Sequence, residues 1–484
     1  MKFKSIISIL FAGALLSSCH GDLDIVQKSE VSAGSMWKTQ DDAISAMYGL
    51  YNQFRSSFSS GYVYWGEYRT GLWGDGLAGT ASNAEVFQNV ISTNHHMADW
   101  TELYTTINTA NLILKYAPNI AFISETEKNK VLANALYVRA FCYYWIGRIW
   151  GDAPLLLDGF ESDSQEGLYP TRQPLSEVFA QVNADIEQAL SLIPKSFDSK
   201  TLATEASLNM LKADFSLWNY KVCHGGNDLL DKADRALKTV LNNSSYSLEE
   251  DFANIFKNEK GSEIIFAWPY IQDEFTGGYP SDYLVPNQYV SNDVIEAPVK
   301  IGSHQQWVFY TEDYKKILSE NKNDQRTIVS FETFFDEKKN ATHQWINKLS
   351  GSWTNGTRVF DSDIVVYRLA DAYLLAAEVQ MEKGNIPEAV KYLNVIAKRA
   401  YGVDNFYPTS MSRADLVENI VKERQKEFAA EGKLWWDYIR LGVVFDKVPF
   451  LAGKENVKNI LLWPISQNSI NKNPNLVQTE GYDK

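Results

Sequence analysis

The residues best suited to chemistry lie in one short segment, residues 62–83, with the sequence YVYWGEYRTGLWGDGLAGTASN. Flat aromatic faces suit the C–H side of sugar rings, while carboxylate, amide and guanidinium groups suit the ring hydroxyls. The segment therefore predicts either a carbohydrate-binding loop or a structural loop held in place by its own aromatic side chains. On the first interpretation, the candidate binding residues are Trp65, Tyr68, Arg69, Trp73, Asp75 and Asn83.

A second group of aromatic residues lies between about 243 and 362, where the chain becomes rich in Gly, Pro and Asn. Short apolar alternations such as EIIFAW interrupt this segment, which we expect to be an irregular, loop-rich insertion. Loops on a rigid scaffold commonly form binding surfaces. The candidate binding residues here are Tyr283, Trp307 and Trp353, with Tyr279 and Trp345 in the same set.

Helices must position both segments, because apolar residues recur at helical spacing through most of the remaining chain. Ser124 and Glu127 are spaced as a capping box, and Gly151 and Pro154 end the apolar stripe that follows. We expect an all-α fold of tetratricopeptide-like helix pairs, with a scaffold over about 36–242 and 363–484 and the insertion over 243–362. The predicted helices are 124–150, 174–193, 203–222, 229–241, 363–383, 387–400 and 412–432.

Several charged residues fall inside or beside these apolar stripes, where a charge is tolerated only if it is paired. We interpret them as scaffold, and Trp435, Trp436 and Trp463 as core. The charged residues are Arg139, Asp152, Arg368, Asp371, Glu423, Arg424, Glu427 and Glu431.

Enzyme and cofactor motifs are nearly absent from the sequence, which contains no HExxH, GxSxG or phosphate-loop lysine motif. GDGLAG (74–79) has the spacing of a dinucleotide fingerprint, but no buried strand precedes it, so we expect a flexible loop. His95 and His96 should point apart, and no nearby Cys or His completes a zinc set. We expect no cofactor, no metal and no catalytic residues. A carboxylate pair for glycoside hydrolysis stays open, because sequence spacing does not fix a distance in space.

Composition excludes nucleic-acid binding. The 484 residues carry 46 Lys and Arg against 60 Asp and Glu, a formal charge of −14, and no basic cluster is visible. The length predicts one large elaborated domain or two closely packed ones. Cys142 and Cys223 are expected to be buried free thiols.

The N-terminus has the parts of a secretory signal peptide over residues 1–18: Lys2 and Lys4, an apolar run from Ile6 to Leu16, and small residues before Cys19. The run is shorter than the ~20 apolar residues that span a bilayer. Leu16-Ser17-Ser18-Cys19 resembles a bacterial lipobox, so we expect Cys19 to be acylated and to anchor a mature domain of residues 19–484.

Six segments resemble, in order, the SusD-like (RagB/SusD) family of outer-membrane nutrient-binding lipoproteins. They are ALYVRAFCYYWIGRIWGDAPLLL (135–157), YSLEEDFANIF (246–256), VVYRLADAYLLAAEV (365–379), LNVIAKRAYG (393–402), VKERQKEFAAEGKLWWDYIRLG (421–442) and LWPISQNSINKNPNLVQTEGY (462–482). Lys433 and Ser466 stand where the family usually has Arg and Pro.

The resemblance implies a binding protein rather than an enzyme, lipid-anchored in the outer membrane and facing the exterior. Such a protein captures oligosaccharide for a SusC-like TonB-dependent transporter, and its ligand site draws on the two aromatic segments described above. A peptide ligand is an alternative within the family. The sequence does not name the glycan.

Overall fold

The computed structural model describes residues 36–257, 261–274, 276, 279–291, 305–354 and 357–482. The predicted signal peptide and Cys19 lie outside these residues, so both remain predictions.

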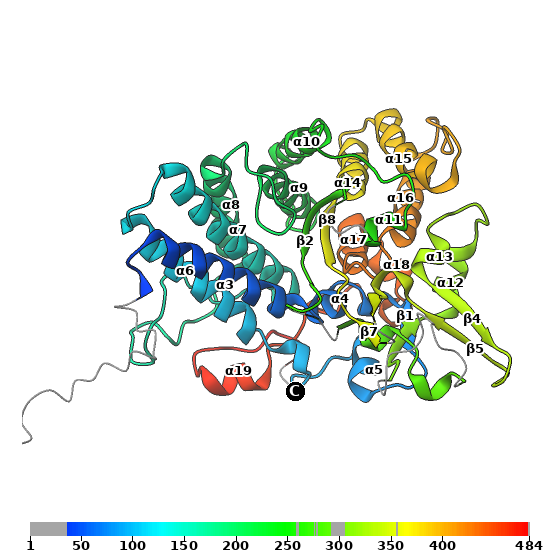
Figure 1. The fold of residues 1–484 in the computed structure, drawn as a ribbon, viewed down its shortest axis with the longest axis horizontal. Helices are drawn as coiled ribbons and strands as arrows, with labels where there is room; N and C mark the ends of the chain where they lie inside the picture. The colour runs from blue at the N-terminus through cyan, green and yellow to red at the C-terminus, as the bar shows by residue number, and fades with distance from the viewer. Residues whose placement is uncertain are drawn as a thin grey trace, which may run out of the picture.

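The scaffold is built from helices that pack in successive pairs, which confirms the all-α, tetratricopeptide-like prediction. Figure 1 shows the pairs following one another from α3 and α6 at the left, over α9 and α10 at the top, to α14 and α15 at the upper right. The pairs are α3 (Gln40–Phe58) with α6 (Thr101–Tyr116), α7 (Glu125–Trp150) with α8 (Leu175–Leu192), α9 (Glu205–Lys221) with α10 (Asp228–Leu241), and α14 (Leu369–Glu382) with α15 (Ile386–Tyr401).

Local signals in the sequence account for these helix ends. The Ser124 hydroxyl accepts the backbone N–H of Glu127 and begins α7. Gly151, with φ +76°, ends the same helix, and Gly402, with φ +69°, ends α15. Helix α16 (Arg413–Glu427) packs on both α14 and α15 and closes the series.

One predicted helix, 363–383, is wrong at its start. Residues Ile364–Arg368 form strand β8, which pairs antiparallel with β2 (Ile264–Trp268), and helix α14 begins only at Leu369. Both strands are buried along their whole length. A fully buried apolar strand lacks alternation, so periodicity does not separate it from a helix; the β-branched pair Val365-Val366 was the remaining signal.

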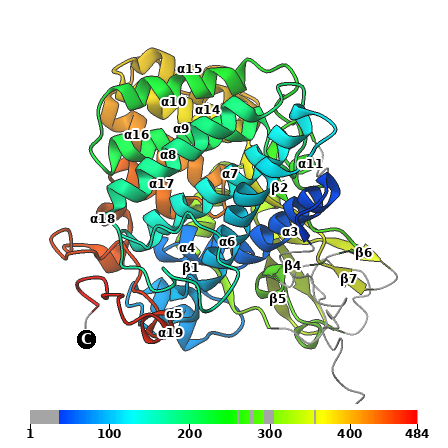
Figure 2. The same cartoon turned by 90° about the vertical axis from the view of Figure 1, so that its left-hand side faces the viewer.

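Between 243 and 362 the described chain combines loops with short strands and helices, and its part from residue 308 to 345 lies at the lower right of Figure 1. Its hairpins β4–β5 and β6–β7 project at the lower right of Figure 2, on the opposite side from α19 (Gln467–Lys472). The elements are α11 (Asn254–Lys257), β3 (Val308–Tyr310), α12 (Glu312–Ser319), α13 (Thr327–Ser330), β4 (Glu332–Asp336), β5 (Ala341–Trp345), β6 (Ser352–Thr354) and β7 (Thr357–Val359), with 3-10 turns at Tyr279–Tyr283, Asn287–Tyr289 and Asn347–Leu349.

Shorter elements join the scaffold to this segment. They are α4 (Gly61–Gly66), β1 (Trp73–Asp75), α5 (Ala81–Phe87), α17 (Leu434–Leu441), α18 (Val444–Lys447) and α19 (Gln467–Lys472), with 3-10 turns at Tyr68–Thr70, His96–Ala98, Ala117–Asn119 and Pro449–Leu451.

One large apolar core runs through the scaffold and includes Trp435, Trp436 and Trp463, as predicted. Cys142 is a buried free thiol in α7, but Cys223 is exposed, because it follows the end of α9 instead of continuing its buried face. Among the described residues, no helix combines the length and the apolarity that crossing a bilayer requires.

Candidate functional site

The aromatic segment 62–83 is not an open loop. It folds into α4, a 3-10 turn, the short strand β1 and α5, and β1 pairs antiparallel with β3 of the insertion. The glycine-rich stretch after β1 is held as well, because the N–H groups of Gly76 and Ala78 donate to the carbonyls of Trp307 and Gln306. The segment therefore joins the scaffold to the insertion.

Burial contradicts the expectation that the aromatic side chains of this segment offer open faces to a sugar. Trp73 is 2% exposed, its ring packs 5.0 Å from that of Tyr68 and 5.7 Å from that of Tyr283, and its Nε1 donates to Glu67. The Tyr68 and Tyr283 hydroxyls lie 2.8 Å apart in the same cluster. Trp65 is also buried and donates from Nε1 to the carbonyl of Met97. The alternative, a structural segment held by its own aromatic residues, fits Trp65, Tyr68 and Trp73, two of which also pack on Tyr283 of the insertion.

Arg69 is likewise buried, and its guanidinium has protein partners where we expected a sugar. It donates to Asn89 Oδ1 at 2.8 Å and to the carbonyls of residues 460–462, and it lies 4.3 Å from the ring centroid of Trp435. Burial lowers its pKa to about 10. These contacts hold the C-terminal segment against the turn after α4, a role that no local sequence signal indicates.

The remaining predicted residues lie in different surroundings. Asn83 is buried and accepts the Tyr64 hydroxyl, while Asp75 is exposed at the end of β1. Trp307 is half-buried against the core. Trp353 lies in β6, and its side chain is outside the described part of the structure.

The candidate site is a cleft of about 940 Å³ where the scaffold meets the insertion. Its volume lies at the upper end of the about 300–1,000 Å³ of small-molecule sites. The cleft has four walls. The end of α3 with the start of α4 forms the first, and the turn at His96–Ala98 with the start of α6 forms the second. The insertion forms the third wall, and α19 forms the fourth. Lining residues include Ser56, Ser59, Ser60, Trp65, His96, Asp99, Thr101, Glu102, Tyr270, Thr276, Asp282, Asn468 and Lys472.

This cleft is rich in hydroxyl and carboxylate groups, which suit the hydroxyls of a sugar. Ser56, Thr101 and Glu102 are exposed on its surface, and Ser60 begins α4 without a side-chain hydrogen bond to that helix. Asp99 joins two walls, since its Oδ2 accepts from Asn468 Nδ2 of α19 at 2.9 Å. Of the predicted site residues with described side chains, Trp65 lines this cleft. The serine run SSFSSG (56–61) is the sequence signal that could have indicated the wall formed by α3 and α4.

His95 and His96 do not point apart, contrary to expectation. Their rings stack with centroids 4.6 Å apart, because the chain forms a 3-10 turn there instead of a regular helix or strand. His95 is buried, with Nδ1 accepting the backbone N–H of Met97, and burial lowers its pKa to about 4. His96 is exposed and lines the cleft.

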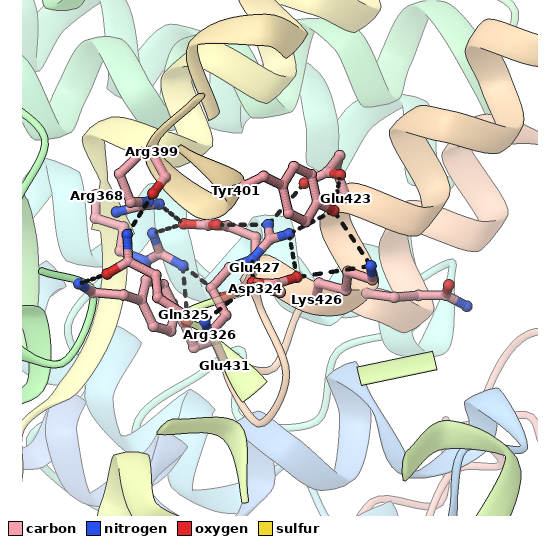
Figure 3. Close-up of polar contacts among 12 residues, drawn as sticks. Asp324, Gln325, Arg326, Arg368, Arg399, Tyr401, Glu423, Lys426, Glu427 and Glu431 are labelled. Atoms are coloured by element: carbon pink, nitrogen blue, oxygen red, sulfur yellow. Dashed lines mark hydrogen bonds and ion pairs between the residues drawn. The ribbon is translucent and has the colours of Figure 1, made fainter. Parts of the chain in front are cut away.

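Seven of the eight charged residues of the apolar stripes are buried and paired, as predicted. Figure 3 shows the largest group, in which Arg326 of the insertion binds Glu423 at 2.7 Å and Glu427 at 3.1 Å on α16. Arg368 donates to Glu427 and Glu431. The charges of Arg399, Arg368 and Arg326 hold the pKa of Glu427 below its usual range, and those of Arg368 and Lys348 do the same for Glu431. These carboxylates are therefore engaged in joining the insertion to the scaffold.

The other charged residues of the stripes follow the same rule, except Asp152. Arg139 makes a two-pronged ion pair with Asp185 between α7 and α8, at 2.6 and 2.8 Å. Asp371 accepts from Lys433 and Arg424, which lower its pKa to about 2. Asp152 is exposed and accepts the N–H of Leu175 at the start of α8.

Comparison with known proteins gives matches along most of the chain. Residues 302–482 match the profile described as the SusD family, and residues 75–211 match one described as starch-binding, associating with the outer membrane. SusD-like protein P38 of Formosa agariphila is 24% identical over 99% of this chain and 100% of its own length.

Solved structures agree with these sequence matches. A SusD superfamily protein from Bacteroides fragilis superposes with a TM-score of 0.80 at 25% identity, covering 92% of this chain and 100% of its own. NanU of B. fragilis gives a TM-score of 0.79 at 26% identity, covering 95% of this chain and 100% of its own. From profiles, full-length relative and shared fold together, this chain belongs to the SusD-like family.

Proposed function

We propose that this protein is a surface-exposed, lipid-anchored glycan-binding protein that captures oligosaccharide and delivers it to a SusC-like TonB-dependent transporter in the outer membrane. The cleft between scaffold and insertion is the proposed ligand site. The observation that carries the proposal is a large cleft lined by hydroxyl and carboxylate groups in a chain of the SusD-like family. The description of the matched profile, starch-binding and associating with the outer membrane, supports a glycan ligand and this location.

The first experiment is affinity electrophoresis and calorimetry of the full chain, purified in detergent, against a panel of glycans and peptides. A capture protein retains one class of oligosaccharide without shortening it. Release of new reducing ends over hours would instead favour a glycoside hydrolase acting through the carboxylates of the cleft. Binding of peptides alone would favour the peptide-binding alternative.

A pair of matched variants tests whether the cleft is the site. Ser56→Leu places an apolar side chain on the exposed wall formed by α3, whereas Ser191→Leu makes the same change on an exposed turn of α8 that does not line the cleft. We expect Ser56→Leu to weaken glycan binding by about tenfold, which is about 1.4 kcal/mol. Ser191→Leu should bind as the unchanged protein does. Equal binding by both variants would place the site elsewhere, with Trp307 and Trp353 the next positions to test.

A further inference from the structure

We infer that the cleft selects neutral oligosaccharides and rejects sulfated or carboxylated ones. The inference rests on the proposed function and names the ligand class of the same site. It follows from the excess of carboxylates that line the cleft, because the negative charge of an anionic sugar would be repelled by them.

Carboxylates outnumber cations among the described lining residues. The lining contains three carboxylates, those of Asp99, Glu102 and Asp282, and one ammonium group, that of Lys472; no arginine lines the cleft within the part of the chain that the structure describes. Arginine is the side chain whose planar fork best matches sulfate and carboxylate oxygens. A site built for anionic sugars would be expected to contain it.

Lys472 does not reverse this excess of negative charge, because its positive charge already interacts with the carboxylate of Asp99. Hydrogen bonds from Thr101 and Asn468, together with the charge of Lys472, hold the pKa of Asp99 below its usual range, so Asp99 stays ionised. The charge of Asp99 therefore offsets that of Lys472, the one described ammonium group in the cleft. The exposed carboxylate of Glu102 then leaves the cleft with a net negative charge.

The imidazole in the cleft adds no positive charge at neutral pH. Although His96 is exposed to the cleft, the protein packed against one side of its ring removes part of its hydration; this lowers its pKa from the ordinary value and keeps the ring neutral. The whole chain carries a formal charge of −14, so the long-range field opposes an incoming polyanion as well. Neutral sugar hydroxyls, in contrast, can donate to an exposed carboxylate such as Glu102 without bringing a negative charge next to it.

The test compares each glycan that binds in the panel above with its own sulfated derivative, for example pullulan, xylan or laminarin beside the sulfated polymer. At low ionic strength the sulfated form should bind at least about tenfold more weakly, and added salt should narrow the difference because it screens the repulsion. Equal or tighter binding of the sulfated form would overturn the inference. A ligand that is itself anionic would overturn it too, while leaving the proposed function standing. If no glycan binds, the proposed function fails and this inference fails with it.

Matched charge variants show whether the cleft itself makes the selection. Glu102→Lys reverses an exposed charge in the cleft, and Glu337→Lys makes the same change in the exposed β4–β5 turn, outside the cleft lining. Both change the net charge of the chain by the same amount. We expect Glu102→Lys to strengthen binding of the sulfated glycan severalfold and Glu337→Lys to leave it unchanged. Equal effects of the two variants would contradict selection by the cleft.

Discussion

Trp73 belongs to the core of the junction between scaffold and insertion, so its removal should act on stability. Its ring packs against Tyr68, Tyr283 and Tyr310, and its Nε1 is bound to Glu67. Deleting a buried indole costs about 3–5 kcal/mol of unfolding free energy. We expect a loss of this size for Trp73→Ala in urea unfolding. Trp307→Ala, at a half-buried position of the same insertion, should cost clearly less; the reverse order would contradict this account of the two indoles.

His95 gives the protein a predictable pH dependence. Its Nδ1 accepts the N–H of Met97, Ser82 lies at its Nε2, and the rings of Tyr64, His96 and Trp463 surround it, with Glu85 the nearby carboxylate that opposes the effect of burial. Protonation would remove the acceptor at Nδ1. The pKa is lowered to about 4, below the 6.5 of an exposed histidine, so the unfolded chain takes up the proton first as pH falls.

The stability that His95 provides is therefore complete above about pH 6.5 and is lost as pH falls toward 4, by at most about 3 kcal/mol. Urea unfolding at several pH values checks this. His95→Gln, which keeps an acceptor but does not titrate in this range, should lose less stability than the unchanged protein between pH 7 and 4.5. Parallel curves for the two proteins would show that His95 has no such role.

Among the elements, the contact between the insertion and α16 depends on buried charges. Arg326 binds Asp324 within the insertion and Glu423 and Glu427 on α16, and the Tyr401 hydroxyl also donates to Glu423. Removing one partner of such a group leaves the others charged and buried, at a cost of about 3–5 kcal/mol. We expect Arg326→Ala to destabilise the protein by this amount and to increase hydrogen exchange in α12, α13 and the β4–β5 hairpin.

The control for this prediction is a surface ion pair in the same insertion. Lys316 and Asp313 pair at 2.8 Å on α12, with both side chains largely exposed. Lys316→Ala should therefore cost less than about 1 kcal/mol. If hydrogen exchange in the insertion does not change in Arg326→Ala, the buried network does not hold the insertion in place.

Particular elements show why the sequence predicts helices well and strands poorly here. Helices α7 to α10 each carry a 3.6-residue apolar period or a local cap, so residues close together in the sequence are enough to predict where these helices lie. Strand β8 pairs with β2 about 100 positions earlier in the chain, and neither shows alternation. Arg69 likewise depends on carbonyls of residues 460–462, so no local pattern could indicate that it is buried.

For the molecule as a whole, the cleft is assembled from segments that are distant in the sequence: the end of α3, the turn before α6, the insertion and α19. Spacing in the sequence could indicate the two regions that contribute to a site but not which side chains reach it. This is why the polar, aromatic-rich segment 62–83 looked like a binding loop. Its aromatic residues are instead buried where these segments meet, with Trp65 also lining the cleft, and a serine-rich helix end forms the open wall.

The anchor is the last property that concerns the whole molecule, and it can be tested by one substitution. Each buried methylene of an acyl chain contributes about 0.8 kcal/mol, so more than one chain on Cys19 would hold the protein stably on a membrane. In cells that export the protein, Cys19→Ala should abolish labelling by a fatty-acid probe and leave the protein either uncleaved or in the soluble fraction. Protease treatment of intact cells tests on which side of the membrane the protein lies. The protease should degrade the unchanged protein if it faces the exterior. Retained labelling and membrane association of Cys19→Ala would show that the chain is held there by something other than this cysteine.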